Sequence, residues 1–286
     1  MLRRDLTEVV RKAFEGRYAV ERELGRGGAA RVFLARGADG VPVALKVLHP
    51  ELQASVTAER FLREVRVLNQ IDHPLVTRVL DSGMQDYFVF YVMPFEEGDT
   101  LRAALDRSPI MPLPQVLRLA RDLLDALGAA HRHEIVHRDV KPENILLAPR
   151  GAVLLDFGIA RAVEAATPDR LTRSGITVGT SGYMSPEQIQ ALPLDARSDV
   201  YSVGCVLFEC LAGRPPFAHR SEHIVLQLHL KEAPPDVRVY RPEVPPGIAA
   251  AIGKALLKDR EQRWPSAAAL RDALLGAAGM ELAAAR

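Results

Sequence analysis

The chain has 286 residues, of which 48% are hydrophobic and 26% charged, and its formal net charge is +1. This composition is that of an ordinary globular protein, long enough for one large domain or two small ones. The charge balance argues against a nucleic-acid-binding protein, which would carry a basic surplus. No apolar run approaches the roughly 18 residues of a membrane span, and the first residues lack the apolar stretch of a signal peptide, so a soluble, cytoplasmic domain without a membrane segment is expected.

The two cysteines, Cys205 and Cys210, lie in one apolar segment. Their spacing fits neither a zinc-binding pattern nor a redox CxxC motif. We therefore expect two buried thiols in a reducing compartment.

The N-terminal third predicts a short helix followed by a sheet. Residues 1–16 carry an apolar stripe at helical spacing that ends at Gly16, and we treat them as an N-terminal extension. Residues 17–95 contain short runs of β-branched and aromatic residues separated by Gly-rich turns, which predicts five antiparallel strands, the fourth over 76–83. A helical period at 55–71 adds one helix, which Asp72-His73-Pro74 ends.

Beyond a boundary at 96–99 the pattern becomes helical, and residues 99–275 are expected to form a mainly α-helical region. Helices are predicted at 114–133, 199–213, 248–258 and 266–275, and a small hairpin at 148–158. The segment 199–213 is apolar nearly all round, which predicts a buried helix. Residues 276–286 are rich in alanine and are expected to fray as a tail.

Two features of the sheet region point to a phosphate group. Residues 24–32, LGRGGAARV, hold Gly25 and Gly27, which let backbone amides approach a phosphate. An ordinary Gly-rich hairpin is the alternative, and because the loop runs into a strand rather than a helix, a dinucleotide-binding loop is excluded. Lys46 ends the apolar run VALK, and its simplest interpretation is an edge lysine with its charge in water. Glu64 on the following predicted helix offers a partner, and a buried Lys–Glu pair makes sense where the lysine also holds an anion.

The densest polar cluster is VHRDVKPENILL at 136–147, which has apolar residues on both sides. Asp139 can accept or orient the proton of a hydroxyl group, and Lys141 is a point charge suited to a transferring phosphate. Asn144 and Asp156, the latter in DFG, supply the hard oxygen ligands that Mg²⁺ prefers. Each residue alone has a simple structural explanation, but all of them in this order predict phosphate chemistry.

Residues 172–187, TRSGITVGTSGYMSPE, are rich in Ser and Thr and poor in large apolar side chains. A flexible surface loop is one interpretation. The other is a loop that phosphorylation orders through the added negative charge.

Together these motifs resemble those of the eukaryotic-like (Hanks-type) serine/threonine protein kinases of bacteria. The resemblance covers about residues 17–275 and runs through LGRGGAARV, VALK, Glu64, HRDVKPEN, DFG, SPE, DARSDVYSVG and Arg263. It implies an α+β fold of two lobes: an N-lobe at 17–95 with a five-stranded antiparallel sheet and one helix, and a mainly helical C-lobe at 99–275. It also implies ATP-dependent phosphorylation of Ser and Thr hydroxyls on proteins, autophosphorylation and a role in signal transduction.

The resemblance assigns the catalytic and metal-binding roles. Asp139 would be the catalytic carboxylate, and Lys141 would neutralise charge on the γ-phosphate. Asn144 and Asp156 would hold Mg²⁺, with Mn²⁺ as an alternative metal.

The resemblance also assigns the ATP-binding positions. Lys46, positioned by Glu64, would bind the α- and β-phosphates. Met93 would be the gatekeeper beside the adenine, and Phe95 would offer hinge backbone groups to the adenine edge. The other positions are in the Gly-rich loop and around the adenine: Leu24, Gly25, Gly27, Val32, Ala44 and Leu146.

Four further positions in the C-lobe follow from the resemblance. Asp199 would accept hydrogen bonds from amides of the catalytic loop, and Glu187 and Arg263 would form a structural ion pair. Thr180 would touch the catalytic Asp and Lys. These residues would position the substrate and the loop rather than react.

Arg138 precedes Asp139, which resembles the class of kinases that a phosphate in the activation loop switches on. The charge-assisted bonds of a phosphate to arginine would order the loop. We therefore predict autophosphorylation at Thr172 and Ser174, with Thr177 as a weaker candidate.

Three departures from the family pattern leave every catalytic group in place. Ala30 replaces the third glycine of the Gly-rich loop, Pro94 follows the gatekeeper and offers no N–H group, and SPE replaces APE but keeps Glu187.

Two other classes are weighed against an active protein kinase. A pseudokinase or scaffold would bind nucleotide without transferring phosphate, and it would be expected to have lost one of Lys46, Asp139 or Asp156, all of which are present. A small-molecule kinase would lack the full Gly-rich loop and the SPE segment. The expected partners are therefore protein substrates, with a homodimer through the N-lobe as a further expectation.

Overall fold

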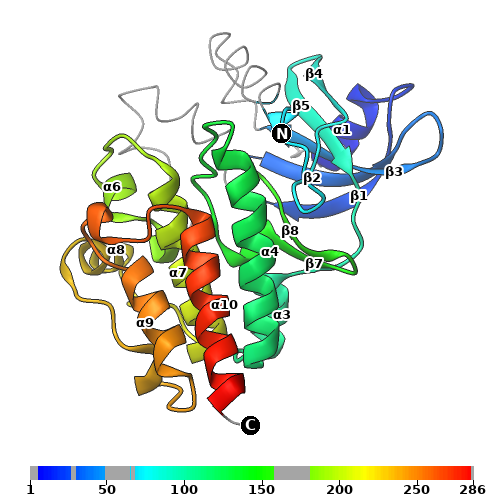
Figure 1. The fold of residues 1–286 in the computed structure, drawn as a ribbon. Helices are drawn as coiled ribbons and strands as arrows, with labels where there is room; N and C mark the ends of the chain where they lie inside the picture. Colours follow the sequence, from blue (N-terminus) through cyan, green and yellow to red (C-terminus); the bar gives the residue numbers. More distant parts are fainter. Residues whose placement is uncertain (1–5, 27–29, 49–64, 66–67, 158–180, 285–286) are drawn as a thin grey trace. The chain divides into compact units, whose positions relative to one another are not determined.

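A computed structural model of the chain describes residues 6–26, 30–48, 65, 68–157 and 181–284 (Figure 1). These residues fall into two compact units. The first draws on Met1–Ile71 and Thr77–Glu97, and the second on Asp72–Val76, Gly98–Gly158 and Val178–Arg286. The predicted α+β fold with two lobes is confirmed.

The first unit contains the predicted five-stranded antiparallel sheet. Its strands pair in the order β1-β2-β3-β5-β4 and are β1 (Ala19–Arg26), β2 (Ala30–Arg36), β3 (Pro42–Leu48), β4 (Asp81–Gln85) and β5 (Phe88–Pro94). The fourth strand was expected at 76–83 but begins at Asp81. Two of the preceding residues have other partners: Val76 bridges Leu154 in parallel, and the amide of Val79 donates to Asn69 Oδ1 at 3.0 Å.

One face of this sheet is covered by the N-terminal segment, whose helix α1 spans Leu6–Ala13. The ring of Phe14, which follows the helix, meets Phe90 of β5 edge to face at a centroid distance of 5.0 Å. Arg17 then lies over Phe90, 4.8 Å from the ring centre, and its Nη2 is 2.9 Å from Asp81 Oδ2. The segment is thus part of the hydrophobic core of the first unit.

The second unit is mainly helical (Figure 1). Its α-helices are α3 (Leu101–Arg107), α4 (Leu113–His131), α6 (Pro186–Ile189), α7 (Ala196–Ala212), α8 (Glu222–Lys231), α9 (Pro246–Ala255) and α10 (Ala267–Ala284). Short 3₁₀ turns are η2 (Pro142–Asn144), η3 (Ser181–Tyr183), η4 (Val237–Val239) and η5 (Arg260–Gln262). The four predicted helices correspond to α4, α7, α9 and α10, whereas α3, α6 and α8 were not predicted.

Helix α10 runs through most of the segment that was expected to fray. It continues to Ala284 although Gly276 and Gly279 lie within it, and the alanines of this segment favour the helix because alanine has the highest helix propensity. Within the described part of the chain, we find no helix with the length and apolar character to cross a membrane.

Helix α7 is the centre of the second unit, with α4, α9 and α10 packed alongside it (Figure 1). The Asp195 side chain caps its N-terminus by accepting from Arg197 N, and Gly213, with φ of 74°, ends it. As expected, Cys205 and Cys210 are free and buried in this helix, and burial raises the pKa of both thiols. The predicted buried helix is therefore confirmed.

A small sheet of β6 (Asp99–Thr100), β7 (Ile145–Ala148) and β8 (Gly151–Leu154) holds the polar loop of the second unit. The predicted hairpin is its β7–β8 part, and β6 adds a third strand. Gly98 has φ of 153° beside this sheet, where a Cβ atom would lie 2.5 Å from Leu147 O, so that only glycine fits.

Candidate active site

The loop between α4 and β7 brings three predicted residues together. Asn144 Nδ2 donates to Asp139 at both the backbone oxygen (2.8 Å) and Oδ2 (2.9 Å). Lys141 Nζ lies 2.9 Å from the same Oδ2. The Asp139 carboxylate is therefore fixed by an amide and a cation, although its side chain remains 17% exposed.

Asp199, from the first turn of α7, fixes the backbone of this loop. Its carboxylate accepts the N–H groups of His137 (2.8 Å) and Arg138 (2.9 Å), and His131 Nε2 lies 2.8 Å from Oδ2. Burial alone would raise the pKa of Asp199, but the hydrogen bond and charge of His131 and the His137 amide hold it below its usual value. Arg138 has φ of 67°, a conformation that costs of order 1–3 kcal/mol for a side-chain-bearing residue unless its surroundings hold it. Asp199 supplies that restraint.

His137 joins the loop to the segment after β8. Its Nε2 lies 2.9 Å from Leu155 O, and the Asp139 amide donates to its Nδ1 at 3.2 Å. The neutral ring with its hydrogen on Nε2 satisfies both contacts. Burial lowers the pKa of His137, which agrees with a neutral ring. The ring also lies against Phe157, at a centroid distance of 4.6 Å.

The backbone at Asn144 lies beside the backbone next to Asp156, because Leu155 N donates to Asn144 O at 2.9 Å. The nitrogen of the Asn144 amide is used by Asp139, so the amide oxygen is its ligand atom. This oxygen and the Asp156 carboxylate are hard ligands, and Mg²⁺ completes such a set with water and substrate phosphates. The donor set of the second unit therefore fits Mg²⁺.

Four of the predicted ATP-binding positions, Val32, Ala44, Lys46 and Met93, share one face of the sheet in the first unit. Val32 and Tyr91 are the cross-strand partners of Lys46, and Met93 is a partner of Ala44. Cross-strand partners point to the same face, and so do positions two apart on a strand. This face is opposite to the one that α1 covers, where Phe33 and Leu45 point. Lys46 Nζ lies 5.6 Å from the centre of the Tyr91 ring.

Three further predicted ATP-binding positions are Leu24, Leu146 and Phe95. Leu24 lies at a register shift in β1, just before Gly25, which pairs with Val32. Leu146 lies in β7 of the second unit and is 8% exposed. Phe95 was expected to offer hinge backbone groups, but its amide donates to Pro42 O at 3.4 Å, so an acceptor atom of adenine would need another donor.

Six predicted residues lie outside the described part of the chain: Gly27, Glu64, Thr172, Ser174, Thr177 and Thr180. The Lys46–Glu64 pair, the phosphorylation sites and the contact of Thr180 with the loop therefore stay predictions.

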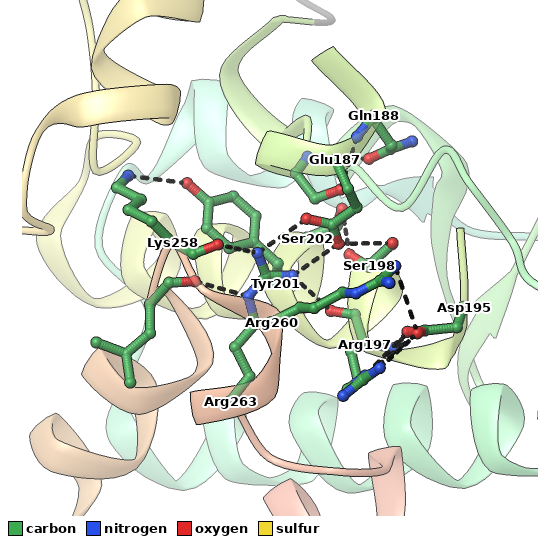
Figure 2. A network of polar contacts seen from close by, with 12 residues as sticks. Glu187, Gln188, Asp195, Arg197, Ser198, Tyr201, Ser202, Lys258, Arg260 and Arg263 are labelled. Atoms are coloured by element: carbon green, nitrogen blue, oxygen red, sulfur yellow. Dashed lines mark hydrogen bonds and ion pairs between the residues drawn. The ribbon is translucent and has the colours of Figure 1, made fainter. Parts of the chain in front are cut away.

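The expected ion pair of Glu187 and Arg263 is present and buried (Figure 2). Arg263 donates from Nη1 to Glu187 Oε1 (2.7 Å) and from Nη2 to Oε2 (2.9 Å), and Ser198 Oγ donates to Oε1 (2.7 Å). Burial would raise the pKa of Glu187, but the hydrogen bonds of Arg263 and Ser198 hold it below its usual value. Arg263 also donates to the backbone oxygens of Leu257, Lys258 and Arg197. Every charge in this pair is therefore matched.

Gln188 was missed by the sequence analysis. Ser185 and Gln188 form a capping box at the N-terminus of α6, and Gln188 Nε2 donates to Arg138 O at 2.7 Å. The segment that contains SPE is thereby bonded to the loop of Asp139. The spacing Ser-x-x-Gln was a readable signal for the helix start, although not for this contact.

Comparisons with known proteins agree with the geometry. The sequence model of the family described as "Protein kinase domain" matches residues 18–274. The serine/threonine-protein kinase pkn2 of Myxococcus xanthus is 40% identical over 271 residues, which are 92% of this chain and 32% of that protein. The DNA damage-responsive serine/threonine-protein kinase RqkA of Deinococcus radiodurans is 42% identical over 261 residues, 89% of this chain and 38% of that protein. The serine/threonine-protein kinase PknB of Mycolicibacterium smegmatis is 38% identical over 267 residues, 91% of this chain and 42% of that protein. The chain thus spans about a third to two-fifths of the length of these relatives.

Proposed function

Because the chain belongs to the protein kinase family, we propose that it transfers the γ-phosphoryl group of ATP to Ser and Thr hydroxyls of proteins and takes part in signal transduction. The observation that carries this proposal is the Asp139 carboxylate, which Lys141 and Asn144 hold in a loop fixed by Asp199. Phosphoryl transfer needs little covalent help from the protein and much prearranged charge. A carboxylate and a cation fixed side by side meet that need.

In this mechanism Asp139 accepts or orients the proton of the substrate hydroxyl as its oxygen approaches phosphorus. Lys141, 2.9 Å from Asp139, neutralises charge that develops on the transferred phosphoryl group. Lys46 binds the α- and β-phosphates, and Glu64 positions it. Asn144 and Asp156 would hold Mg²⁺, or Mn²⁺ through the same oxygen ligands, and the bound metal would supply positive charge to the phosphates.

The finer assignments follow from the same proposal. Val32, Ala44, Met93 and Leu146 enclose the adenine, and Leu24, Gly25 and Gly27 lie along the phosphates. Thr172 and Ser174 are autophosphorylation sites, and Thr180 helps to position the substrate. Catalysis takes place in the cytoplasm, where ATP is available, and two buried free thiols are compatible with such a reducing compartment. The N-lobe mediates a homodimer, which sedimentation of the purified chain tests.

A phosphotransfer assay tests the proposal. The purified chain, labelled ATP and Mg²⁺ are compared with Asp139→Asn and with Asp272→Asn, a matched control on the surface of α10, followed by mass-spectrometric mapping of the labelled sites. We expect the native chain and the control to label themselves at Thr172 or Ser174 and to label a basic test protein, and Asp139→Asn to do neither while still binding ATP. Binding of ATP by all three without any transfer would instead support a scaffold that binds nucleotide.

A further inference from the structure

A second charged cluster in the second unit is centred on Arg102 of α3. Its Nη2 donates to Glu209 Oε1 of α7 at 2.6 Å and to the Tyr183 hydroxyl at 3.0 Å. Its Nε lies 3.3 Å from Glu143 Oε1, and its Nη1 lies 3.3 Å from Asp106, one turn further along α3. Tyr183 donates in turn to Glu209 Oε2 at 2.5 Å. One guanidinium group therefore joins side chains from four segments.

This cluster adjoins the proposed catalytic residues. Glu143 lies in η2, between Lys141 and Asn144, which both turn toward Asp139. The Glu143 side chain turns to Arg102 instead. A peptide whose hydroxyl reaches Asp139 extends about 3.3 Å per residue, so its side chains within a few positions of the acceptor pass within reach of Glu143.

Within the cluster, Arg102 keeps its positive charge and Tyr183 keeps its proton. Burial would lower the pKa of Arg102, but its hydrogen bond to Glu209 and the charges of Tyr183, Glu209 and Glu143 raise it above the usual value. Burial and Glu209 raise the pKa of Tyr183, so its hydroxyl keeps its proton. The Glu209 side chain is only 6% exposed, whereas that of Glu143 is 43% exposed. Arg102 thus compensates a buried carboxylate and at the same time covers part of an exposed one.

From this geometry we propose that Arg102 determines substrate specificity: its guanidinium group occupies Glu143 and Glu209 and so prevents them from selecting a basic side chain in the protein substrate. The inference rests on the proposed function, because it concerns the peptide that Asp139 would receive. A planar guanidinium group matches carboxylates through several N–H groups, which an ammonium group cannot reproduce. A substrate arginine could make the same bonds only where Arg102 is missing.

The test uses a neutral peptide with one serine acceptor, and a set of peptides that carry a single arginine at each of the five positions on either side. For each position, the ratio of kcat/KM for the arginine peptide to that for the neutral peptide is measured with the native chain, Arg102→Gln and Arg102→Lys. We expect Arg102→Gln to raise this ratio at least tenfold at one position, since a hydrogen bond between charged groups contributes about 1.5–3 kcal/mol. Arg102→Lys should give a smaller rise.

Two controls separate this effect from a general change of structure. Arg107→Gln removes an exposed arginine from the same helix, where it pairs with Asp99, and should leave every ratio unchanged. The double variant Arg102→Gln with Glu143→Gln should lose the gained preference. A purely structural role of Arg102 would change kcat/KM for both peptides alike and leave the ratios as they are.

Two results would overturn the proposal. One is an active Arg102→Gln variant whose kcat/KM ratios equal those of the native chain. The other is a tenfold preference of the native chain for arginine at the peptide position where Arg102→Gln shows it. If Arg102→Gln does not fold, Glu143→Gln alone decides, because an occupied Glu143 cannot select substrate and the native ratios should persist. A fall in a ratio would then contradict the inference. Transfer of phosphate by the native chain to the neutral peptide is measured first, so that failure of the proposed function is distinguished from failure of this inference.

Discussion

Replacement of Glu187 by glutamine tests whether the buried ion pair with Arg263 stabilises the second unit. The two side chains are 4% and 0% exposed, so solvent does not screen their attraction. Glutamine keeps the shape and one acceptor oxygen. Its NH₂ group would face a donor of Arg263, however, which leaves a buried guanidinium group without its counter-charge.

The expected loss follows from this burial. Removal of one partner from a buried pair costs about 3–5 kcal/mol. The low end, about 3 kcal/mol, applies here because the new glutamine side chain would keep one hydrogen bond and because Arg263 still donates to the backbone oxygens of Leu257, Lys258 and Arg197. For a unit of about 150–250 residues this corresponds to a fall in Tm of about 6–12 °C.

The measurement is urea unfolding followed by the fluorescence of Trp264, the single tryptophan, which adjoins Arg263 and donates to Ala251 O. The matched control is Glu261→Gln, which removes an exposed partner of Arg197 and should cost about 0–1 kcal/mol. Because the folded pKa of Glu187 lies below its usual value, its contribution is present above about pH 4.5 and is lost as pH falls through the folded pKa. A loss in Glu187→Gln no larger than in the control at pH 7 would refute the reasoning.

Three further predictions concern other buried side chains: Phe14, His229 and Asp199. Phe14→Ala should destabilise the first unit by about 3–5 kcal/mol, because its ring is fully buried against Phe90, and hydrogen exchange of the β1–β3 amides should show the loss. Burial lowers the pKa of His229 to about 3, so that between pH 6 and 4.5 the unfolded chain binds a proton that the native chain does not. Stability should therefore fall by about 1.4 kcal/mol per pH unit as pH drops, and His229→Asn should remove this slope from pH-dependent unfolding curves; an unchanged slope would be contrary evidence. Asp199→Asn sets an NH₂ group against the amide of His137 or Arg138. We expect kcat to fall at least tenfold, because a misplaced loop costs on the order of 100-fold in rate, while ATP affinity measured by calorimetry stays within threefold. A normal kcat would show that the loop does not need the Asp199 carboxylate.

The sequence predicted the parts of the fold whose cause is local. Strand alternation and Gly-rich turns located the five-stranded sheet, and the continuous apolar run of α7 predicted its burial. Helix α3 was missed because seven residues are too few for a periodic signal, and only Leu101 and Leu105 of it are buried. Helix α8 was missed because its buried positions, Val225 and His229, leave no clear apolar stripe. The fourth strand was placed too early because Val76 has a partner in β8, which no local pattern reveals.

The difference between local and long-range causes also separates the residues proposed to be catalytic from those proposed to determine substrate specificity. Asp139, Lys141 and Asn144 lie within six consecutive positions, so their order in the sequence was enough to predict that they meet. Arg102 and Glu209 are 107 positions apart, and nothing in either segment indicates the other. Chains that share the catalytic loop can therefore differ in the charges that border it, because those charges depend on long-range packing between α3 and α7. Whether a carboxylate such as Glu143 faces the substrate or a neighbouring arginine is a property of the folded surface.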